Sequence, residues 1–292
     1  MASTKVESAY YSYLTERMDK GESKNIVIPT AIELITKHLQ KKSVVKILDV
    51  GCFNGAMLNQ IRINTPDELR QQVHYAGAEV DKSLIDDGRK KYPELTFNYM
   101  DLNGSLPDLG QHDIVVLSNV LHEVTPNSEG TDAEAAISAT LREISSFVTA
   151  GGNLLILDGL KPNHDDKIIE VHFTGSGPHK LYKFFAQKYS AFKVHAVDIG
   201  TNAIQTRGKD LVTFMTKARY LFEDYWPIES QQSYQFFTKE QFYKVLGLSG
   251  FRITRFEPQR FTQEYLNSIY ASTNPKIEYP AKNVLVVATK IN

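Results

Sequence analysis

The sequence contains a single cysteine, Cys52, among its 292 residues. One thiol excludes a disulfide within the chain and any metal site built from several thiolates, and it is typical of a reducing compartment. The chain also lacks an apolar run of the roughly 18 residues that a membrane-spanning helix needs, and its first residues lack the basic and apolar blocks of a signal peptide. We therefore expect a cytoplasmic protein without a membrane segment.

The chain also has no excess of charge of either sign. Its 33 Lys and Arg residues face 34 Asp and Glu residues, which gives a net charge of −1 at pH 7. Without a global positive field, nucleic acids and anionic membranes are not the expected partners. With 42% hydrophobic and 23% charged residues, the composition is that of an ordinary globular protein, large enough for one domain and an appendage.

A glycine turn follows the first strand-like segment. Residues 44–50 are mostly β-branched and apolar, Gly51 and Gly55 follow, and apolar residues then recur at helical spacing over residues 57–61. In an open α/β sheet such a turn brings backbone amides at a helix N-terminus to a ligand, and glycine lets the ligand approach closely. The turn is therefore predicted to bind a cofactor.

The spacing argues against a nicotinamide dinucleotide. That fold requires Gly-x-Gly-x-x-Gly and an acid about 20 residues further on, whereas the next acids here, Glu79 and Asp81, lie about 30 residues away. The pattern resembles motif I of the class I S-adenosylmethionine-dependent methyltransferases, over residues 44–161 and again from 237 onward. The resemblance implies S-adenosylmethionine as the cofactor and S-adenosylhomocysteine as the product. The residues expected around its methionine part are Asp49, Gly51, Cys52, Phe53 and Gly55.

Phe53 stands where the family usually has a third glycine. A turn that required a positive φ at this position would be strained by a phenylalanine. The shape of the turn around the methionine end of the cofactor is therefore left open at this point.

The resemblance also implies an α/β fold. We expect a Rossmann-like, doubly wound seven-stranded sheet in the order 3-2-1-4-5-7-6 with an antiparallel last strand. The expected strands are residues 44–50, 74–81, 95–102, 153–158, 251–256 and 283–290, with the fourth strand and its exit loop at 112–124. Residues 131–148 read as an amphipathic helix that Gly151 and Gly152 end. The methyltransferase core would comprise residues 44–160 and 238–292, with a helical N-terminal cover at 1–43 and a largely helical cap insertion at 161–237.

Acidic residues end the second and third expected strands. In the family pattern, the acid after the second strand accepts hydrogen bonds from both ribose hydroxyls, for which a carboxylate offers two oxygens. We favour Asp81 for this role, with Glu79 as the competing candidate. Asp101 and Leu102 match the family position beside the adenine. Asp101 also reads as the start of a turn before Gly104, and both interpretations can hold.

The exit of the fourth strand carries the candidate catalytic residues. His122 and Glu123 fall where plant-type O-methyltransferases have a catalytic histidine followed by an acid or amide, and Ser118 is expected to contact the cofactor. An imidazole can remove a proton from a hydroxyl near neutral pH. Alternatively His122 only hydrogen-bonds the loop, and Glu123 either orients it or replaces it as the base.

Two absences narrow the substrate. Residues 118–121 lack the Asn-Pro-Pro-Tyr type of motif used by adenine and glutamine amino methylases. Cytosine C5 methylation needs a nucleophilic cysteine on another loop, and Cys52 lies in motif I. Both activities are therefore disfavoured.

The insertion at 161–237 is locally basic. Between residues 161 and 219 there are ten Lys or Arg against five acids. The excess indicates either a solvated helix face or a site for an anionic substrate. Its four histidines lack the spacing of a zinc site, so no metal is expected. The aromatic residues over 220–237 fit either a core or a pocket for an aromatic acceptor.

Two other segments have open assignments. A second insertion, residues 258–282, is expected to pack beside the first or at a subunit interface. The N-terminal segment reads as two helices whose apolar stripes pack on the sheet, or of which the first, with Tyr10, Tyr11, Leu14 and Met18, closes the active site as a lid.

The expected function is transfer of a methyl group to an oxygen or nitrogen of a small molecule, with anionic and aromatic acceptors as candidates, in a secondary-metabolite type of pathway. Two alternatives remain. One is a methyltransferase acting on RNA or protein, suggested by the basic insertion, and the other is a non-catalytic cofactor-binding partner subunit, suggested by Phe53. The chain is expected to be a monomer or homodimer.

Overall fold

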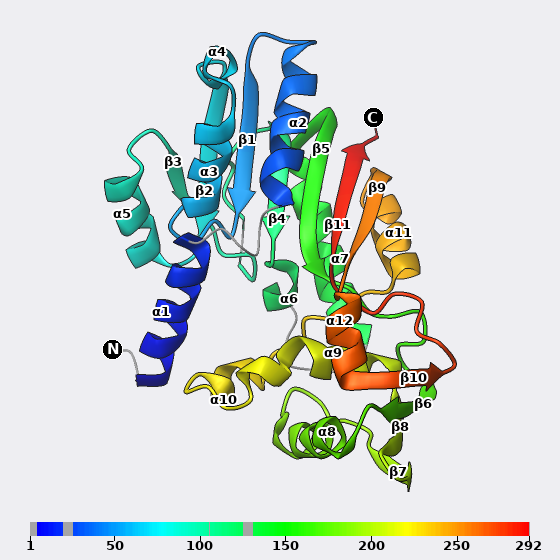
Figure 1. The fold of residues 1–292 in the computed structure, drawn as a ribbon. Coiled ribbons are helices and arrows are strands. Elements are labelled where there is room, and N and C mark those ends of the chain that lie inside the picture. The colour runs from blue at the N-terminus through cyan, green and yellow to red at the C-terminus, as the bar shows by residue number, and fades with distance from the viewer. Residues whose placement is uncertain (1–4, 20–25, 105, 125–130, 292) are drawn as a thin grey trace.

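A seven-stranded sheet forms the centre of the molecule (Figure 1), which a computed structural model describes for residues 5–19, 26–104, 106–124 and 131–291. The spatial order is β3-β2-β1-β4-β5-β11-β9. The strands are β1 (Val45–Val50), β2 (Val73–Glu79), β3 (Thr96–Tyr99), β4 (His112–Ser118), β5 (Val148–Gly159), β9 (Phe251–Arg260) and β11 (Ala281–Lys290). β11 is antiparallel to both neighbours, and the remaining pairs are parallel. The predicted order and the antiparallel last strand are confirmed.

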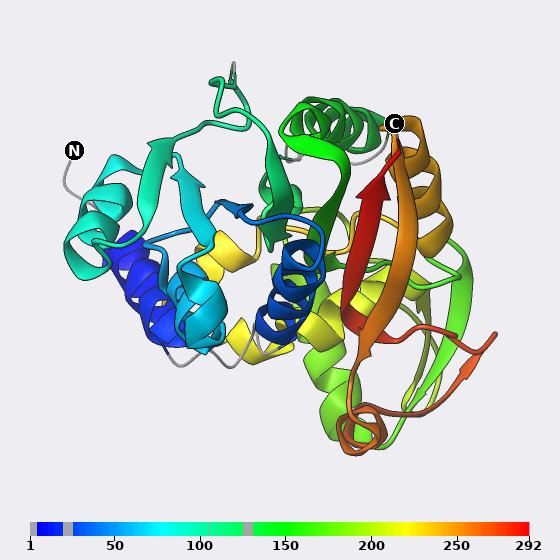
Figure 2. The same cartoon turned by 90° about the horizontal axis from the view of Figure 1, so that it is seen from above.

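Helices cover both faces of the sheet (Figure 2). The helices α2 (Val27–Leu39) and α3 (Ala56–Asn64) pack on one face, and α7 (Thr131–Ser146) and α11 (Lys239–Leu248) pack on the other. Two further helices, α4 (Asp67–Arg70) and α5 (Lys82–Lys91), flank β2 in the chain, and α5 contacts β2 and β3. Because both faces are covered, every residue of β4 is buried, which explains its continuous apolar run.

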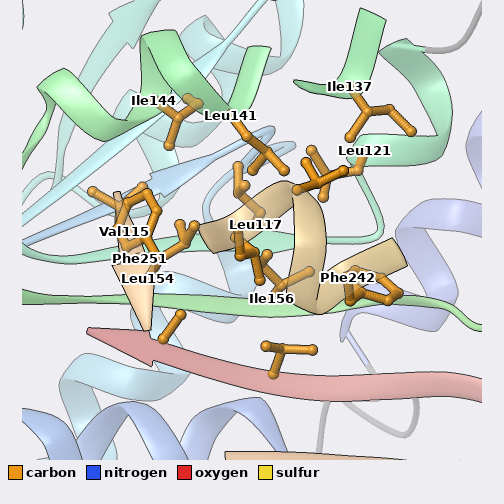
Figure 3. Packing of buried hydrophobic residues seen from close by; sticks show 14 of the residues in the cluster. Val115, Leu117, Leu121, Ile137, Leu141, Ile144, Leu154, Ile156, Phe242 and Phe251 are labelled. Carbon is orange, nitrogen blue, oxygen red and sulfur yellow. The ribbon is translucent and has the colours of Figure 1, made fainter. Parts of the chain in front are cut away.

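The face under α7 shows how spacing becomes packing. Ile137, Leu141 and Ile144 recur every three or four residues and meet alternate residues of β4 and β5 (Figure 3). All three are fully buried. Burying a side chain of this size contributes about 1.5–3 kcal/mol to the free energy of folding. These three residues therefore hold α7 on the sheet.

The prediction that Gly151 and Gly152 end a helix is wrong. α7 ends at Ser146, and both glycines lie within β5. A Cβ at Gly152 would come within 2.9 Å of the carbonyl oxygen of Asp113 on β4. The glycine therefore permits a close approach of two strands, a role that a glycine pair does not distinguish in sequence from a helix stop.

The cap contains helices, as expected, and in addition a four-stranded antiparallel sheet in the order β10-β6-β8-β7. Its elements are β6 (Ile168–Phe173), α8 (Ser176–Lys188), β7 (Val197–Gly200), β8 (Ala203–Arg207), α9 (Gly208–Lys217), η1 (Ala218–Tyr220), α10 (Trp226–Glu229), α12 (Gln263–Ile269) and β10 (Tyr270–Asn274). The last two come from the second insertion, which shares a hydrophobic cluster with the first. The second insertion therefore packs beside the first within the chain.

The first helix, α1 (Lys5–Asp19), lies near α10 at the side of the cap (Figure 1). The ring of Tyr13 stacks on Tyr225 with centroids 4.7 Å apart, and its hydroxyl lies 2.9 Å from that of Tyr220. By contrast, α2 packs on the sheet. Among the described residues, none of the helices has the length and apolar character needed to cross a bilayer.

The contact between the end of β5 and the segment before α11 yields a prediction. A Cβ at Gly159 would overlap the backbone carbonyl of Tyr234. We expect Gly159→Ala to lower the free energy of unfolding in urea by about 3 kcal/mol, because backbone must move. The matched control is Gly247→Ala in α11, where a Cβ meets open space. It should stabilise by about 0.5–1 kcal/mol, and equal effects of the two changes would contradict this packing.

Candidate active site

A cavity of about 290 Å³ lies at the carboxyl ends of the parallel strands. It is next to β1 and β4, which are neighbours in the sheet although they are not consecutive in the chain. Its walls come from the glycine turn, the ends of β2, β3 and β4, helix α1, the segment before α11 and the start of β11. The lining residues are Tyr10, Leu14, Val50, Gly51, Phe53, Glu79, Val80, Met100, Asp101, Leu102, Asn103, Ser118, Asn119, Val120, His122, Glu123, Val124, Tyr234, Lys282 and Asn283.

The glycine turn adopts left-handed backbone at three positions, Gly51 (φ 68°), Phe53 (φ 54°) and Gly55 (φ 82°). Phe53 therefore takes the strained conformation that its position made a concern. Its backbone amide donates a hydrogen bond to Oε2 of Glu79 at 2.9 Å. This bond from β2 holds the turn, and both Gly51 and Phe53 reach the cavity.

The two acids at the end of β2 have different surroundings. Glu79 lines the cavity, and its Oε1 accepts hydrogen bonds from the amides of Val80 and Asp81 at 2.7 and 3.1 Å. Asp81 caps α5: its Oδ1 accepts bonds from the amide and hydroxyl of Ser83. These bonds hold the pKa of Asp81 below its usual value. The carboxylate that faces the cavity is therefore that of Glu79, not Asp81.

The end of β3 and the end of β4 also line the cavity. Asp101 begins the turn that its sequence context indicates, because its Oδ1 accepts a hydrogen bond from the amide of Asn103 at 2.9 Å. It also lines the cavity with Leu102. Ser118 is 3% exposed, and its hydroxyl has no hydrogen-bond partner within the described part of the chain. A buried hydroxyl in a cavity wall can bind a ligand.

Three residues expected near the cofactor lie behind the lining: Asp49, Cys52 and Gly55. Cys52 fills the space above Gly77, where an added Cβ would come within 2.6 Å of its Sγ. Gly55 is the N-cap of α3. These residues shape the turn, while its neighbouring residues form the cavity surface.

His122 lies between two carboxylates on the short helix α6 (Leu121–Val124). Its Nδ1 is 2.8 Å from Oδ1 of Asp158, and its Nε2 is 3.2 Å from Oε1 of Glu123. Burial disfavours the charged imidazole, but the two carboxylates outweigh it and raise the pKa of His122 to about 10. His122 is therefore protonated at neutral pH, with both ring nitrogens as donors.

Sequence reasoning did not single out Asp158 beside His122, whereas Tyr234 belongs to the predicted aromatic segment and Tyr10 to the predicted lid helix. Asp158, at the end of the fifth strand, is buried and also accepts bonds from the amides of Val120 and Leu121. Tyr234 places its ring 4.6 Å from the imidazole, and its hydroxyl donates to Glu229. Tyr10 of α1 lines the cavity, as a lid would. An acid at the carboxyl end of a buried strand was the available signal for Asp158.

Much of the basic charge in the cap is used internally. Five of the ten cations form ion pairs with acids of the cap, namely Lys161, Lys183, Arg207, Lys209 and Lys217. Lys217 is fully buried and lies 2.7 Å from Oε2 of Glu229 and 3.8 Å from the centroid of the Tyr234 ring. These five cations therefore have a structural role within the cap.

Comparison with solved structures identifies the fold. A S-adenosylmethionine-dependent methyltransferase from Clostridium acetobutylicum superposes with a TM-score of 0.52 at 9% identity, over 97% of this chain and 99% of that one. The DszA carbon methyltransferase gives 0.50 at 14% identity, over 91% and 53%. The CurJ carbon methyltransferase gives 0.47 at 15% identity, over 88% and 52%. The chain thus spans about half the length of the two carbon methyltransferases.

No family model and no curated protein matches the sequence. At identities this low, the superpositions show the fold. Together with the strand order and the cavity at the carboxyl ends of the strands, they show that the chain has the fold of the class I S-adenosylmethionine-dependent methyltransferases.

The surroundings of Glu79 and Asp81 generate a direct test. We expect Glu79→Gln to weaken S-adenosylhomocysteine binding by about tenfold to a hundredfold, because a hydrogen-bonding charge in the cavity is lost. Asp81→Asn is the matched control and should bind as the wild type does, since asparagine caps a helix about as well as aspartate. Calorimetric titration measures both, and a larger loss in Asp81→Asn would restore Asp81 as the ribose acid.

A second test concerns the proton on His122. Because the pKa of His122 is raised from 6.5 to about 10, its contribution to stability is complete below about pH 6.5 and is lost as the pH rises through 10. We expect the wild type to lose a few kcal/mol more than His122→Gln over this range. Nuclear magnetic resonance should show the His122 ring titrating near pH 10 in the wild type. In Asp158→Asn its pKa should fall toward the usual value of 6.5. A ring that titrates near 6.5 in the wild type would contradict the charged state.

Proposed function

We propose that the chain is an S-adenosylmethionine-dependent methyltransferase that transfers a methyl group to an oxygen or nitrogen of a small molecule. The observation that carries this proposal is the composition of one cavity. The glycine turn, Glu79 and Ser118 line it together with His122 and Glu123. Groups suited to a nucleoside and groups suited to an acceptor therefore share one cavity.

The cofactor's place follows from the lining. Glu79 would accept hydrogen bonds from the ribose hydroxyls, since a carboxylate suits a vicinal diol. Asp101 and Leu102 would meet the adenine, whose flat apolar surface also fits Val80 and Met100. The turn from Gly51 to Phe53 would surround the methionine part. Asp49, Cys52 and Gly55 would support that turn from behind.

When bound, S-adenosylmethionine supplies a methyl carbon that is activated by the adjacent sulfonium. The residues of the chain align the acceptor and exclude water, which are the main contributions available to a displacement of this kind. Tyr10 and Tyr234 wall the acceptor side with aromatic rings. Such walls favour a flat or apolar acceptor body.

The charge on His122 changes its proposed role. An imidazole that is already protonated does not remove a proton. We therefore propose that Nε2–H of His122 turns from Glu123 to an acceptor oxygen, and that the Glu123 carboxylate takes the proton which that oxygen gives up. Burial favours a neutral Glu123, but the bond and charge of His122 outweigh it and lower the pKa of Glu123. The Glu123 carboxylate can take the proton from a nitrogen that has just been methylated.

A polymer substrate fits the structure less well. The net charge is −1, and half of the cations over residues 161–219 pair with acids of the cap. A methyltransferase acting on RNA would lose activity steeply with rising salt, whereas a small-molecule enzyme would change little.

The proposed function is tested by titrating S-adenosylhomocysteine and NAD into the same sample by calorimetry. We expect saturable one-site binding of the first and none of the second. Acceptor pools with a labelled methyl donor then test turnover. Binding without turnover on any pool would favour a non-catalytic partner subunit, and absence of S-adenosylhomocysteine binding would refute the proposal.

The role of His122 has its own test once an acceptor is found. We expect His122→Gln to lower kcat/KM about a hundredfold, because one positioned donor is lost. The wild-type rate should fall as the pH rises through about 10, where His122 loses its proton. His74→Gln, at an exposed position on β2, is the control. A wild-type rate that instead rises through pH 6.5 and depends on His122 would identify it as a base.

A further inference from the structure

A second cavity adjoins the first on the cap side. Its volume is about 510 Å³, and Lys282 and Asn283 at the start of β11 line both cavities. The other lining residues are Ile26, Leu157, Met215, Thr216, Arg219, Gln259, Arg260, Phe261, Thr262 and Tyr265. The cavity is therefore built from the core sheet, the first insertion and the second insertion together.

Contacts between the two insertions define this cavity. The hydroxyl of Tyr265 on α12 donates a hydrogen bond of 2.7 Å to the carbonyl of Met215 on α9. These helices lie near the lower ends of β5 and β11 (Figure 1). Because neither insertion is part of the sheet, the shape of the cavity belongs to this chain's additions to the fold.

The charges in the lining all have one sign. Arg219, Arg260 and Lys282 contribute three cations, and none of the lining residues is acidic. Arg219 donates a hydrogen bond to the hydroxyl of Tyr220, and the guanidinium of Arg260 lies 6.0 Å from the ring centroid of Tyr279. The ion pairs formed among the described residues use other basic side chains than these two arginines.

Several other cations of the cap pair with its own acids, as Lys209 does with Asp166 and Lys217 with Glu229. Arg219 and Arg260 line a hollow beside the proposed methyl-transfer cavity and form no such pair among the described residues. Guanidinium groups are well suited to binding carboxylates and phosphates. The first cavity, in contrast, contains the acids Glu79, Asp101 and Glu123.

We propose that the second cavity binds an anionic group of the acceptor, a carboxylate or a phosphate, through Arg219 and Arg260. The acceptor is then a small anionic molecule whose other end passes Lys282 and Asn283 to reach His122 and Glu123. This inference rests on the proposed methyl transfer. It adds a substrate class and assigns two arginines that no sequence motif indicates.

The test uses simple probes of matched shape. Benzoate, phenyl phosphate and neutral benzyl alcohol are titrated by calorimetry into the full chain, with and without saturating S-adenosylhomocysteine. We expect at least one anion to bind about tenfold or more tightly than the alcohol, since each charge-assisted hydrogen bond is strong. The preferred anion distinguishes a carboxylate from a phosphate on the acceptor.

Variants place that binding in the second cavity. Arg219→Gln and Arg260→Gln should each weaken the anion about tenfold or more, without changing affinity for the alcohol. Arg252→Gln is the control, because Arg252 is exposed on the same strand as Arg260 and lies outside the lining. An equal loss in Arg252→Gln would mean general charge attraction and would overturn the proposal.

The outcome separates this inference from the proposed function. If S-adenosylhomocysteine binds but the anions bind no better than the alcohol, the second cavity is not an anion site and methyl transfer stands. If the anions bind and depend on both arginines while S-adenosylhomocysteine does not bind, the anion site stands and the proposed function fails.

Discussion

The carboxylate of Asp158 accepts hydrogen bonds from the amides of Val120, Leu121 and Gly159 and from the ring of His122. It is fully buried at the end of β5, where an unpaired charge would be costly, so all of these donors are needed. Because Val120, Leu121 and His122 belong to the exit of the neighbouring strand β4, their bonds to Asp158 fix how the chain leaves that strand. They also fix the orientation and charge of His122. The part of the cavity lined by His122, where we place the acceptor, depends on this one buried group.

The part of the cavity where we place the cofactor depends on a comparable constraint from β2. Glu79 accepts the amide of Phe53 on one oxygen and the amides of Val80 and Asp81 on the other. The first of these bonds helps to hold Phe53 at a positive φ, a conformation that costs of order 1–3 kcal/mol for a residue with a large side chain. The strained turn therefore lies where the ligand would bind, which is where such strain is usually retained.

The central sheet could be predicted from the sequence because most of its strands are short apolar runs. The order of these runs along the chain, compared with the family pattern, predicts the strand order. Acids at strand ends or shortly after them also predicted where the cavity lies, and two of them, Asp101 and Glu123, line it. The choice between Glu79 and Asp81 could not be made, since it depends on which residue the following helix takes as its N-cap. The sheet of the cap was equally hidden, because β6 pairs with β10, about 100 residues away in the chain, and no local pattern encodes that pairing.

The chain has two adjoining cavities: one at the strand ends that contains three acids, and one with only basic charges that the insertions help to build. The central claim is that the first holds S-adenosylmethionine. A crystal structure with S-adenosylhomocysteine tests it most directly. The account predicts the ribose hydroxyls at the carboxylate of Glu79 and the adenine beside Asp101. The product bound elsewhere, or its ribose held by Asp81 with Glu79 remote from it, would contradict the account.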